Sequence, residues 1–177
     1  VGGVTFSKRI RIEAIKPNRL KIDLNFDNSV LERGEPTKAD FHTEWLTGAK
    51  ARGLSYEIEV SFATASTAFP KFGEFIFEDR TKSFESDESR FASGKGNDQG
   101  DARVEGRLGA GDTAPGMLTA NFTTRVYEES GDFSIDVLRV PYSPYSSYVG
   151  ILSPQKTKEH LNTGSKQSFQ VASVDSK

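Results

Sequence analysis

Apolar and polar residues alternate along much of this chain, and positions 54–62 show the pattern most clearly. Five apolar residues alternate there with four polar ones, in the order Leu54, Ser55, Tyr56, Glu57, Ile58, Glu59, Val60, Ser61 and Phe62. Successive side chains on a β-strand point to opposite faces, so this segment has one apolar and one polar face. We therefore expect a strand with one face buried in the core and the other face exposed to solvent.

Similar segments recur along the chain between turn residues. The expected strands are Leu20–Phe26, Ala39–Trp45, Leu54–Phe62, Phe72–Phe77, Ala102–Leu108, Leu118–Val126 and Phe133–Val137. No segment shows a convincing amphipathic helical pattern. Seven strands within roughly 125 residues are typical of two packed antiparallel sheets, so we predict an all-β, seven-stranded, immunoglobulin-like β-sandwich with partial flanking strands at both ends.

The corner between two of these strands holds the only Trp of the chain. The run from Glu44 to Leu54 carries Trp45, and Gly48 and Gly53 allow a tight change of direction there. We expect Trp45 to cap the core and, with Tyr56 and Phe122, to anchor it. We therefore predict a structural role for this corner and no catalytic role.

Residues 79–101 break the strand pattern. They are charged and rich in serine and glycine, and only Phe84, Phe91 and Ala92 are apolar. Such a composition predicts a long, partly mobile loop, because little apolar burial offsets the entropy of ordering. The glycine-rich run 94–100 resembles a phosphate loop only superficially, since it lacks the Gly-Lys-Ser/Thr ending, and we interpret it as a hairpin tip.

Charge and cysteine content narrow the function classes. The chain has 23 basic and 25 acidic residues, a net charge of −2, which argues against nucleic-acid or anionic-membrane binding. Lys8, Arg9 and Arg11 form a basic cluster, which we interpret as the solvent-exposed face of a strand. There is no cysteine, which excludes disulfides, thiolate metal sites and cysteine nucleophiles within this chain. No run approaches the about 20 apolar residues that cross a bilayer.

Candidate chemistry is sparse. The two histidines, His42 and His160, lack partners at metal-ligand spacing and are interpreted as surface residues. Glu57 and Glu59 share one strand face about 7 Å apart, a position where exposed glutamates are common. Four acidic residues in the predicted loop lack the calcium-loop framework and indicate a solvated face: Asp79, Glu85, Asp87 and Glu88. We therefore predict no catalytic residue, no cofactor-binding or metal-binding residue, and no enzyme.

The two ends of the chain suggest parts of other units. Residues 1–15 are interpreted as the end of a preceding domain or a leading strand, residues 16–143 as the sandwich, and residues 144–177 as a linker and the start of a following domain. The run 141–145 is expected to be a stiff connector, with Tyr145 and Tyr148 at the junction. The chain begins at Val1 without Met, so we expect a piece of a longer tandem array.

Several motifs occur together in a recognisable order. They are Lys16-Pro17-Asn18-Arg19-Leu20-Lys21-Ile22, Glu44-Trp45-Leu46-Thr47-Gly48-Ala49-Lys50-Ala51, Gly131-Asp132, Pro141-Tyr142-Ser143-Pro144-Tyr145 and Tyr148-Val149-Gly150-Ile151. Across residues 14–152 this order resembles the N-terminal macroglobulin-like domains of bacterial alpha-2-macroglobulin family proteins, especially the Bacteroides type. The resemblance implies a seven-stranded macroglobulin sandwich.

The resemblance also implies a function for the parent protein. Members of this family are large, exported proteins of the periplasm, cell envelope or outer membrane that trap proteases in a frame of stacked macroglobulin domains. A protease cuts a bait region, the frame rearranges around it, and many members couple to it through a Cys-x-Glu-Gln thioester. This chain has no cysteine, so no reactive residue is carried over. The implied partners are neighbouring macroglobulin-like domains and, through the full-length protein, target proteases.

Three hypotheses follow from these observations. The first is a non-catalytic structural module of a protease inhibitor, in which residues 79–101 form a cleavable segment. The second is an accessory domain of a secreted or surface protein that binds a glycan or peptide, which requires an aromatic patch outside the core. A hydrolytic enzyme ranks last, because no nucleophile–base pair is recognisable in the sequence.

Overall fold

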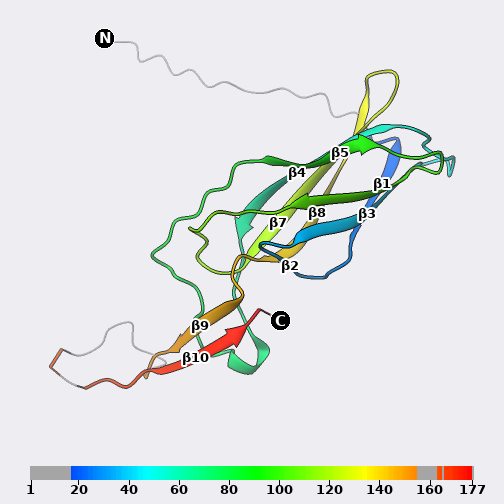
Figure 1. The fold of residues 1–177 in the computed structure, drawn as a ribbon. Helices are drawn as coiled ribbons and strands as arrows, with labels where there is room; N and C mark the ends of the chain where they lie inside the picture. Colours follow the sequence, from blue (N-terminus) through cyan, green and yellow to red (C-terminus); the bar gives the residue numbers. More distant parts are fainter. Residues whose placement is uncertain (1–16, 155–162, 165, 177) are drawn as a thin grey trace, which may run out of the picture.

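The computed structural model describes residues 17–154, 163–164 and 166–176, and its regular elements there are strands apart from one short 3₁₀ helix (Figure 1). The described elements are β1 (Leu20–Phe26), β2 (Leu31–Glu32), β3 (Pro36–Trp45), β4 (Ser55–Thr64), the 3₁₀ helix η1 (Pro70–Phe72), β5 (Ser89–Lys95), β6 (Asp101–Arg107), β7 (Leu118–Tyr127), β8 (Phe133–Ser143), β9 (Ser147–Leu152) and β10 (Gln170–Asp175). The predicted all-β class is confirmed.

Two sheets face each other and form the sandwich. One has three strands in the order β1-β3-β6, and the other has five in the order β2-β8-β7-β4-β5. All neighbours are antiparallel except β2, which pairs with β8 in parallel. Along β4 and β7 buried positions alternate with half-buried ones, as the sequence pattern predicts for strands with one face on the core.

The core between the sheets is aromatic. Phe122 and Ile58 are completely buried, and the rings of Phe41 and Tyr56 lie 4.5 Å apart. Burying one side chain of this size stabilises the fold by about 2 kcal/mol. The predicted anchoring roles of Tyr56 and Phe122 are confirmed.

Trp45 lies at the end of the core rather than inside it. Its ring is half-buried against the core and is covered on one face by the guanidinium of Arg19, 5.2 Å from the ring centre. The corner after it carries the chain from β3 in one sheet to β4 in the other. Gly48 and Gly53 have positive φ angles of 82° and 64°, as the tight change of direction requires. Trp45 therefore caps the core, as expected, but is not one of its fully buried anchors.

Two predicted elements differ from the observed ones. Residues 72–77, expected as a strand, contain the end of η1 and only one isolated bridge, between Ile76 and Ile151. Residues 79–101, expected as a partly mobile loop, contain β5, which pairs with β4. An edge strand needs few apolar side chains, and β5 buries only Phe91. The amino-acid composition of this segment therefore did not indicate a strand. With β2 counted, the sandwich has eight strands rather than seven.

The glycine-rich run 94–100, predicted as a hairpin tip, is instead a tight turn that crosses between the sheets, because the strands on either side of it do not pair with each other. It joins β5 in one sheet to β6 in the other, beside the corner after Trp45. The Gly100 carbonyl accepts a hydrogen bond from the Thr43 amide (3.0 Å), and Asn97 Oδ1 accepts from the Asp101 amide (2.9 Å). Gly100 has φ 88°, and a Cβ there would overlap the Thr43 carbonyl oxygen. This turn is therefore held tightly against the corner.

A two-stranded sheet comes after the sandwich. β8 continues to Ser143, so the predicted connector 141–145 is wrong in its first half, and only residues 144–146 link the elements. β9 then pairs antiparallel with β10, and we call this pair the terminal hairpin. Figure 1 shows it beyond one end of the sandwich. The expected strands near 148–152 and 169–174 are thus present. Their assignment to a following domain stays a prediction, and residues 1–15 lie outside the described part.

Candidate functional site

The outer face of the five-stranded sheet carries ion pairs. Glu57 Oε1 lies 2.9 Å from Arg90 Nη2, and Glu59 accepts a hydrogen bond from Arg125. Tyr127 donates from its hydroxyl to the other oxygen of Glu57 at 3.3 Å. Partial burial, and secondarily the charge of Glu57, raises the pKa of Tyr127, and the hydrogen bond to Glu59 raises the pKa of Arg125. Each glutamate therefore has its own cationic partner, an arrangement of structural ion pairs.

His42 is a surface residue, as predicted. It lies on β3, and its Nδ1 is 2.6 Å from Asp101 Oδ1 at the start of β6. This contact joins neighbouring strands of the three-stranded sheet across their outer face. His160, the second histidine, lies outside the described residues.

The acidic stretch 79–88 is organised around a turn. Asp79 Oδ1 accepts hydrogen bonds from the amide of Thr81 (3.0 Å) and from its hydroxyl (2.6 Å), which lower the pKa of Asp79. Ser86 Oγ accepts from the Phe62 amide at 3.0 Å and ties the stretch to β4. In the parts of the chain that the structure covers, no group of three or more His, Asp or Glu residues is placed to hold a metal ion.

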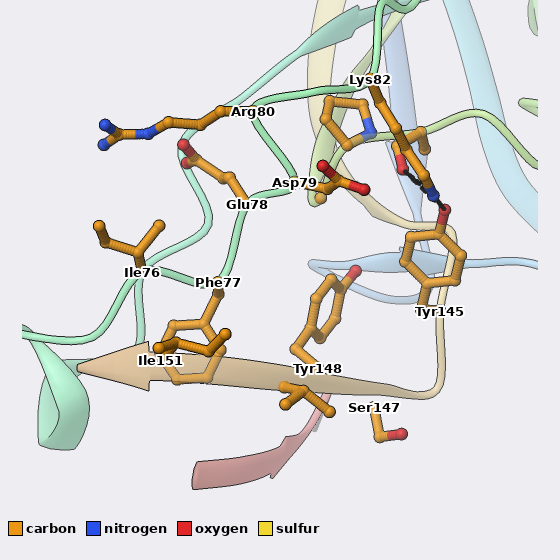
Figure 2. Close-up of a pocket in the computed structure, with 14 residues that line it drawn as sticks. Ile76, Phe77, Glu78, Asp79, Arg80, Lys82, Tyr145, Ser147, Tyr148 and Ile151 are labelled. Atoms are coloured by element: carbon orange, nitrogen blue, oxygen red, sulfur yellow. Dashed lines mark hydrogen bonds between the residues drawn. The ribbon is translucent and has the colours of Figure 1, made fainter. Parts of the chain in front are cut away.

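An open pocket lies at the junction between the sandwich and the terminal hairpin (Figure 2). Its polar side is made by Tyr145, whose hydroxyl donates to the Ala114 carbonyl oxygen at 2.7 Å. Lys82 Nζ lies 3.4 Å from both the Ala114 carbonyl and the Tyr145 hydroxyl, and 5.6 Å from the centre of the Tyr145 ring. These contacts tie three separate loops together.

A buried hydroxyl pair forms the deeper part of the junction. The hydroxyls of Ser143 and Tyr148 lie 2.6 Å apart, and both residues are buried. Burial raises the pKa of Tyr148, because the phenolate would lose its hydration. The Tyr148 ring also contacts Tyr145, 5.9 Å away, and Phe69, 5.6 Å away. Tyr145 and Tyr148 therefore occupy the junction position that the sequence predicts.

Four phenylalanines make a second apolar cluster next to Tyr148. Phe69, Phe72, Phe75 and Phe77 contact one another through ring pairs, with Phe69 and Phe77 4.7 Å apart. Gly150 on β9 packs directly on Phe77, where a Cβ would overlap the ring. Figure 2 shows Phe77 lying beside β9. Sequence reasoning treated 72–77 as a strand and so missed this cluster, although the close spacing of its phenylalanines was a visible signal.

Hydrogen bonds of Thr67 hold the aromatic cluster against the sandwich. Glu78 Oε1 accepts from the Thr67 amide at 2.6 Å, and Thr67 Oγ1 accepts from the Met117 amide at 2.8 Å. Thr67 is buried, and Gly116 packs so closely that a Cβ there would overlap the threonine hydroxyl. The loop after β4 is therefore fixed to the loop before β7.

Two exposed apolar surfaces remain. One is the outer face of the terminal hairpin with Ile76, and the other is the outward side of β8, formed by Phe133, Ile135 and Val137. Asn18 lies at the free edge of β8, where its side-chain amide donates to the Ile135 carbonyl (2.7 Å) and accepts from the Ile135 amide (3.0 Å). In the described residues, no helix is long and apolar enough to cross a membrane.

Comparison with known proteins identifies relatives of this architecture. The family model described as "Bacterial Alpha-2-macroglobulin MG5 domain" matches residues 18–133. No curated protein sequence matches the chain.

Solved structures of bacterial alpha-2-macroglobulins have a similar fold. The native conformation of the Escherichia coli protein superposes with a TM-score of 0.59 and 17% identity, covering 92% of this chain and 11% of that one. The E. coli protein activated by porcine elastase gives a TM-score of 0.59 at 18% identity, covering 91% and 14%. The Salmonella protein reacted with methylamine gives 0.57 at 17% identity, covering 80% and 9%.

The family match and the fold agree. The matched range begins just before β1 and ends at the first residue of β8, so it includes most of the sandwich. The chain spans about a tenth of the length of the first two E. coli structures it resembles. It therefore belongs to the bacterial alpha-2-macroglobulin MG5 domain family.

Proposed function

We propose that this chain is a non-catalytic structural module of a bacterial protease trap. The observation that carries the proposal is the family match over residues 18–133, in a chain whose fold resembles a segment of E. coli alpha-2-macroglobulin. Structures of that protein include forms activated by trypsin and by porcine elastase. By analogy, the parent of this chain responds to attacking proteases.

The role proposed for the module is mechanical. The outer-face carboxylates Glu57 and Glu59 are engaged by arginines, and the surface at the junction with the terminal hairpin consists of packed aromatic rings and hydrogen bonds. Such a surface suits a component that holds neighbours in place and passes their movements on. Because the chain has no cysteine, any thioester of the parent lies elsewhere in it.

The proposed setting derives from the family. Residues 1–15 belong to a preceding domain or leading strand, and residues 144–177 to a linker and the start of a following domain. The parent is exported to the periplasm or cell envelope, and it meets target proteases there. Cell fractionation with an antibody against the sandwich tests this location, and recovery in the cytoplasm would reject it.

Inhibition by the parent protein is the direct test of function. The intact parent is mixed with trypsin or elastase, and cleavage of a large protein substrate is compared with cleavage of a short peptide substrate. Trapping predicts that the protein substrate is protected while the peptide is still cut, because only small molecules reach an enclosed protease. Equal cleavage of the protein substrate with and without excess parent would contradict the proposal.

The alternative of a ligand-binding accessory domain receives less support. The most exposed aromatic residues in the described part are Phe133 on β8 and Phe169 just before β10, so one lies in the five-stranded sheet and the other next to the terminal hairpin. A glycan-binding surface of this kind needs aromatic rings gathered on one face. Saturable binding of a glycan or peptide by the isolated chain would reverse this ranking.

A further inference from the structure

A buried hydroxyl near the end of β8 has no hydrogen-bond partner. Tyr142 is completely buried, and its ring lies 4.8 Å from the ring of Phe62. The Tyr142 hydroxyl forms no hydrogen bond with any group of the described residues. A buried polar group without a partner destabilises the arrangement that encloses it. The cover over this hydroxyl is therefore less stable than the apolar core around it.

The loop between β6 and β7 provides the cover. Burial raises the pKa of Tyr142, and the charge of Arg33 and the amide of Ala110 in this loop oppose the increase, so both groups lie near the phenol oxygen. The Ala110 amide does not reach the geometry of a hydrogen bond to that oxygen. Ala110 also packs against the core. The loop thus closes over the hydroxyl without satisfying it.

Residues 109–113 of this loop lack the bonds of a rigid segment. Among the described residues, no backbone–backbone hydrogen bond involves them, although Leu108 and Ala114 on either side are buried. Gly109 and Gly111 are exposed, and a Cβ added to either would meet no other atom within 4 Å. A segment with anchored ends and no backbone hydrogen bonds opens at a lower free energy than the strands beside it.

Side chains hold this segment in place instead. Arg33, directly after β2, donates to Asp112 Oδ1 at 2.5 Å. At the end of the segment, the Tyr145 hydroxyl donates to the Ala114 carbonyl oxygen at 2.7 Å. The Arg33 and Asp112 side chains are 44% and 83% exposed, and exposed ion pairs stabilise a structure only slightly. The closed position therefore depends on contacts that are easily lost.

We propose that residues 109–113 form a lid that opens over the Tyr142 hydroxyl, and that the Arg33–Asp112 ion pair is the latch that holds the lid closed. The closed lid keeps the ion pair but leaves the hydroxyl without a partner. The open lid loses the ion pair and lets water bond to the hydroxyl. Because these gains and losses offset each other, the two arrangements differ little in free energy.

The lid connects the junction with the sandwich. The Arg33 amide donates to the Ser143 carbonyl at the end of β8 (3.2 Å), and Tyr145 belongs to the linker 144–146. A shift of the linker would therefore move both supports of the lid. This inference goes beyond the proposed function, because opening of the lid is a property of this chain alone. A failure of the tests below would leave the protease-trapping assay of the parent unaffected.

Nitration with tetranitromethane tests the lid, because the reagent modifies tyrosine rings that solvent reaches. Trypsin releases residues 140–156 as one peptide with three tyrosines, and mass spectrometry of its fragments measures each of them. Half-buried Tyr145 is the reactive reference, and Tyr148, buried and bonded to Ser143, is the protected reference. Tyr142 should react faster than Tyr148, although both are buried. Equal protection of the two would overturn the inference.

Breaking the latch should increase the reaction of Tyr142. D112N and R33Q should each raise it about two- to fivefold, the range that an exposed ion pair supplies, without a change at Tyr148. D98N removes the same charge from an exposed position in the turn between β5 and β6, and it should leave Tyr142 unchanged. A parallel increase at Tyr148 would mean that the whole junction opens and would reject the lid. No increase at Tyr142 would reject the latch.

Removal of the hydroxyl tests the starting observation. Y142F should leave the melting temperature unchanged or raise it, because the ring still packs and an unpartnered group is lost. Y148F is the matched variant and should lower the melting temperature, since the Tyr148 hydroxyl lies 2.6 Å from that of Ser143. A similar decrease in both variants would show that the Tyr142 hydroxyl has a partner in the folded chain, and the inference would fall.

Discussion

At the scale of single residues, close contacts with glycine explain why the turns and loops hold together. Gly100 lets the turn between β5 and β6 touch the Thr43 carbonyl, and Gly150 lets β9 touch Phe77. In both places a methyl group would occupy space already taken. Other glycines with positive φ, such as Gly111, have open space around them, so backbone conformation alone matters there.

Alanine at Gly100 and at Gly111 should separate steric overlap from backbone strain. G100A should destabilise the chain by several kcal/mol more than G111A, because both have positive φ (88° and 72°) but only the first meets another atom. G111A should cost about 1 kcal/mol. Urea unfolding followed by tryptophan fluorescence measures both free energies of unfolding. Equal losses in the two variants would show that the overlap is relieved by movement of the turn between β5 and β6.

The buried hydroxyl pair at the junction gives a second prediction. Y148F should lower the free energy of unfolding by about 1–2 kcal/mol, because it leaves the Ser143 hydroxyl without this partner. S143A should have a similar effect, and the double variant should lose less than the sum of the two. Exact additivity in the double-mutant cycle would mean that the two hydroxyls do not interact.

At the scale of elements, β8 shows how an exposed edge is protected. Asn18 forms two hydrogen bonds with Ile135 that imitate a neighbouring strand, in the middle of an edge with apolar outward side chains. Unpaired apolar edges promote association between chains, and a polar side chain that occupies the backbone groups opposes it.

Removing this side chain should expose the edge. N18A should speed exchange of the Ile135 amide and increase self-association at high protein concentration, measured by sedimentation velocity. N28A, at an exposed asparagine in the loop between β1 and β2, serves as the control and should leave both unchanged. A monomeric N18A with unchanged exchange at Ile135 would reject the protective role.

The segment between η1 and β5 gives a prediction about proteolysis. Since β5 spans Ser89–Lys95 and β6 begins at Asp101, residues 79–88 and 96–100 of the hypothesised cleavable loop lack a strand, and only the first of these two segments contains Lys or Arg. Trypsin should therefore cut after Arg80 or Lys82 before it cuts after Arg90 or Lys95, with fragments identified by mass spectrometry. First cleavage at Arg90 or Lys95 would mean that β5 opens more readily than the irregular stretch.

Strands with one buried and one solvent-exposed face were predictable from their alternation of apolar and polar residues. Strands without this alternation were not. β4 and β7 alternate over ten residues each, and the sequence predicts both well. β5 is a polar edge strand whose stability comes from backbone pairing with β4, which composition does not record. The segment 72–77 is apolar without being extended, because its phenylalanines pack on one another and on Tyr148. The positions of Tyr145 and Tyr148 at the junction were predictable, but their hydrogen-bond partners are distant in sequence.

At the scale of the whole molecule, the chain enters and leaves the sandwich at opposite ends. The Leu20 amide lies against Ser134, near the start of β8, whereas β8 ends at Ser143 beside the junction. Figure 1 shows the terminal hairpin beyond that second end. The long axis of the sandwich therefore lies between the entry of the chain at β1 and its exit at the end of β8.

This separation determines how the molecule would respond to a pulling force. A load applied between Arg19 and Ser143 would act nearly along the strands, so the ladder bonds of β1 with β3 and of β7 with β8 would be sheared together rather than opened one at a time. Rupture in that direction requires many bonds to fail at once, whereas a load applied across the strands breaks them in sequence. A module with this geometry is stiff along the line that joins its neighbours and much weaker when peeled sideways.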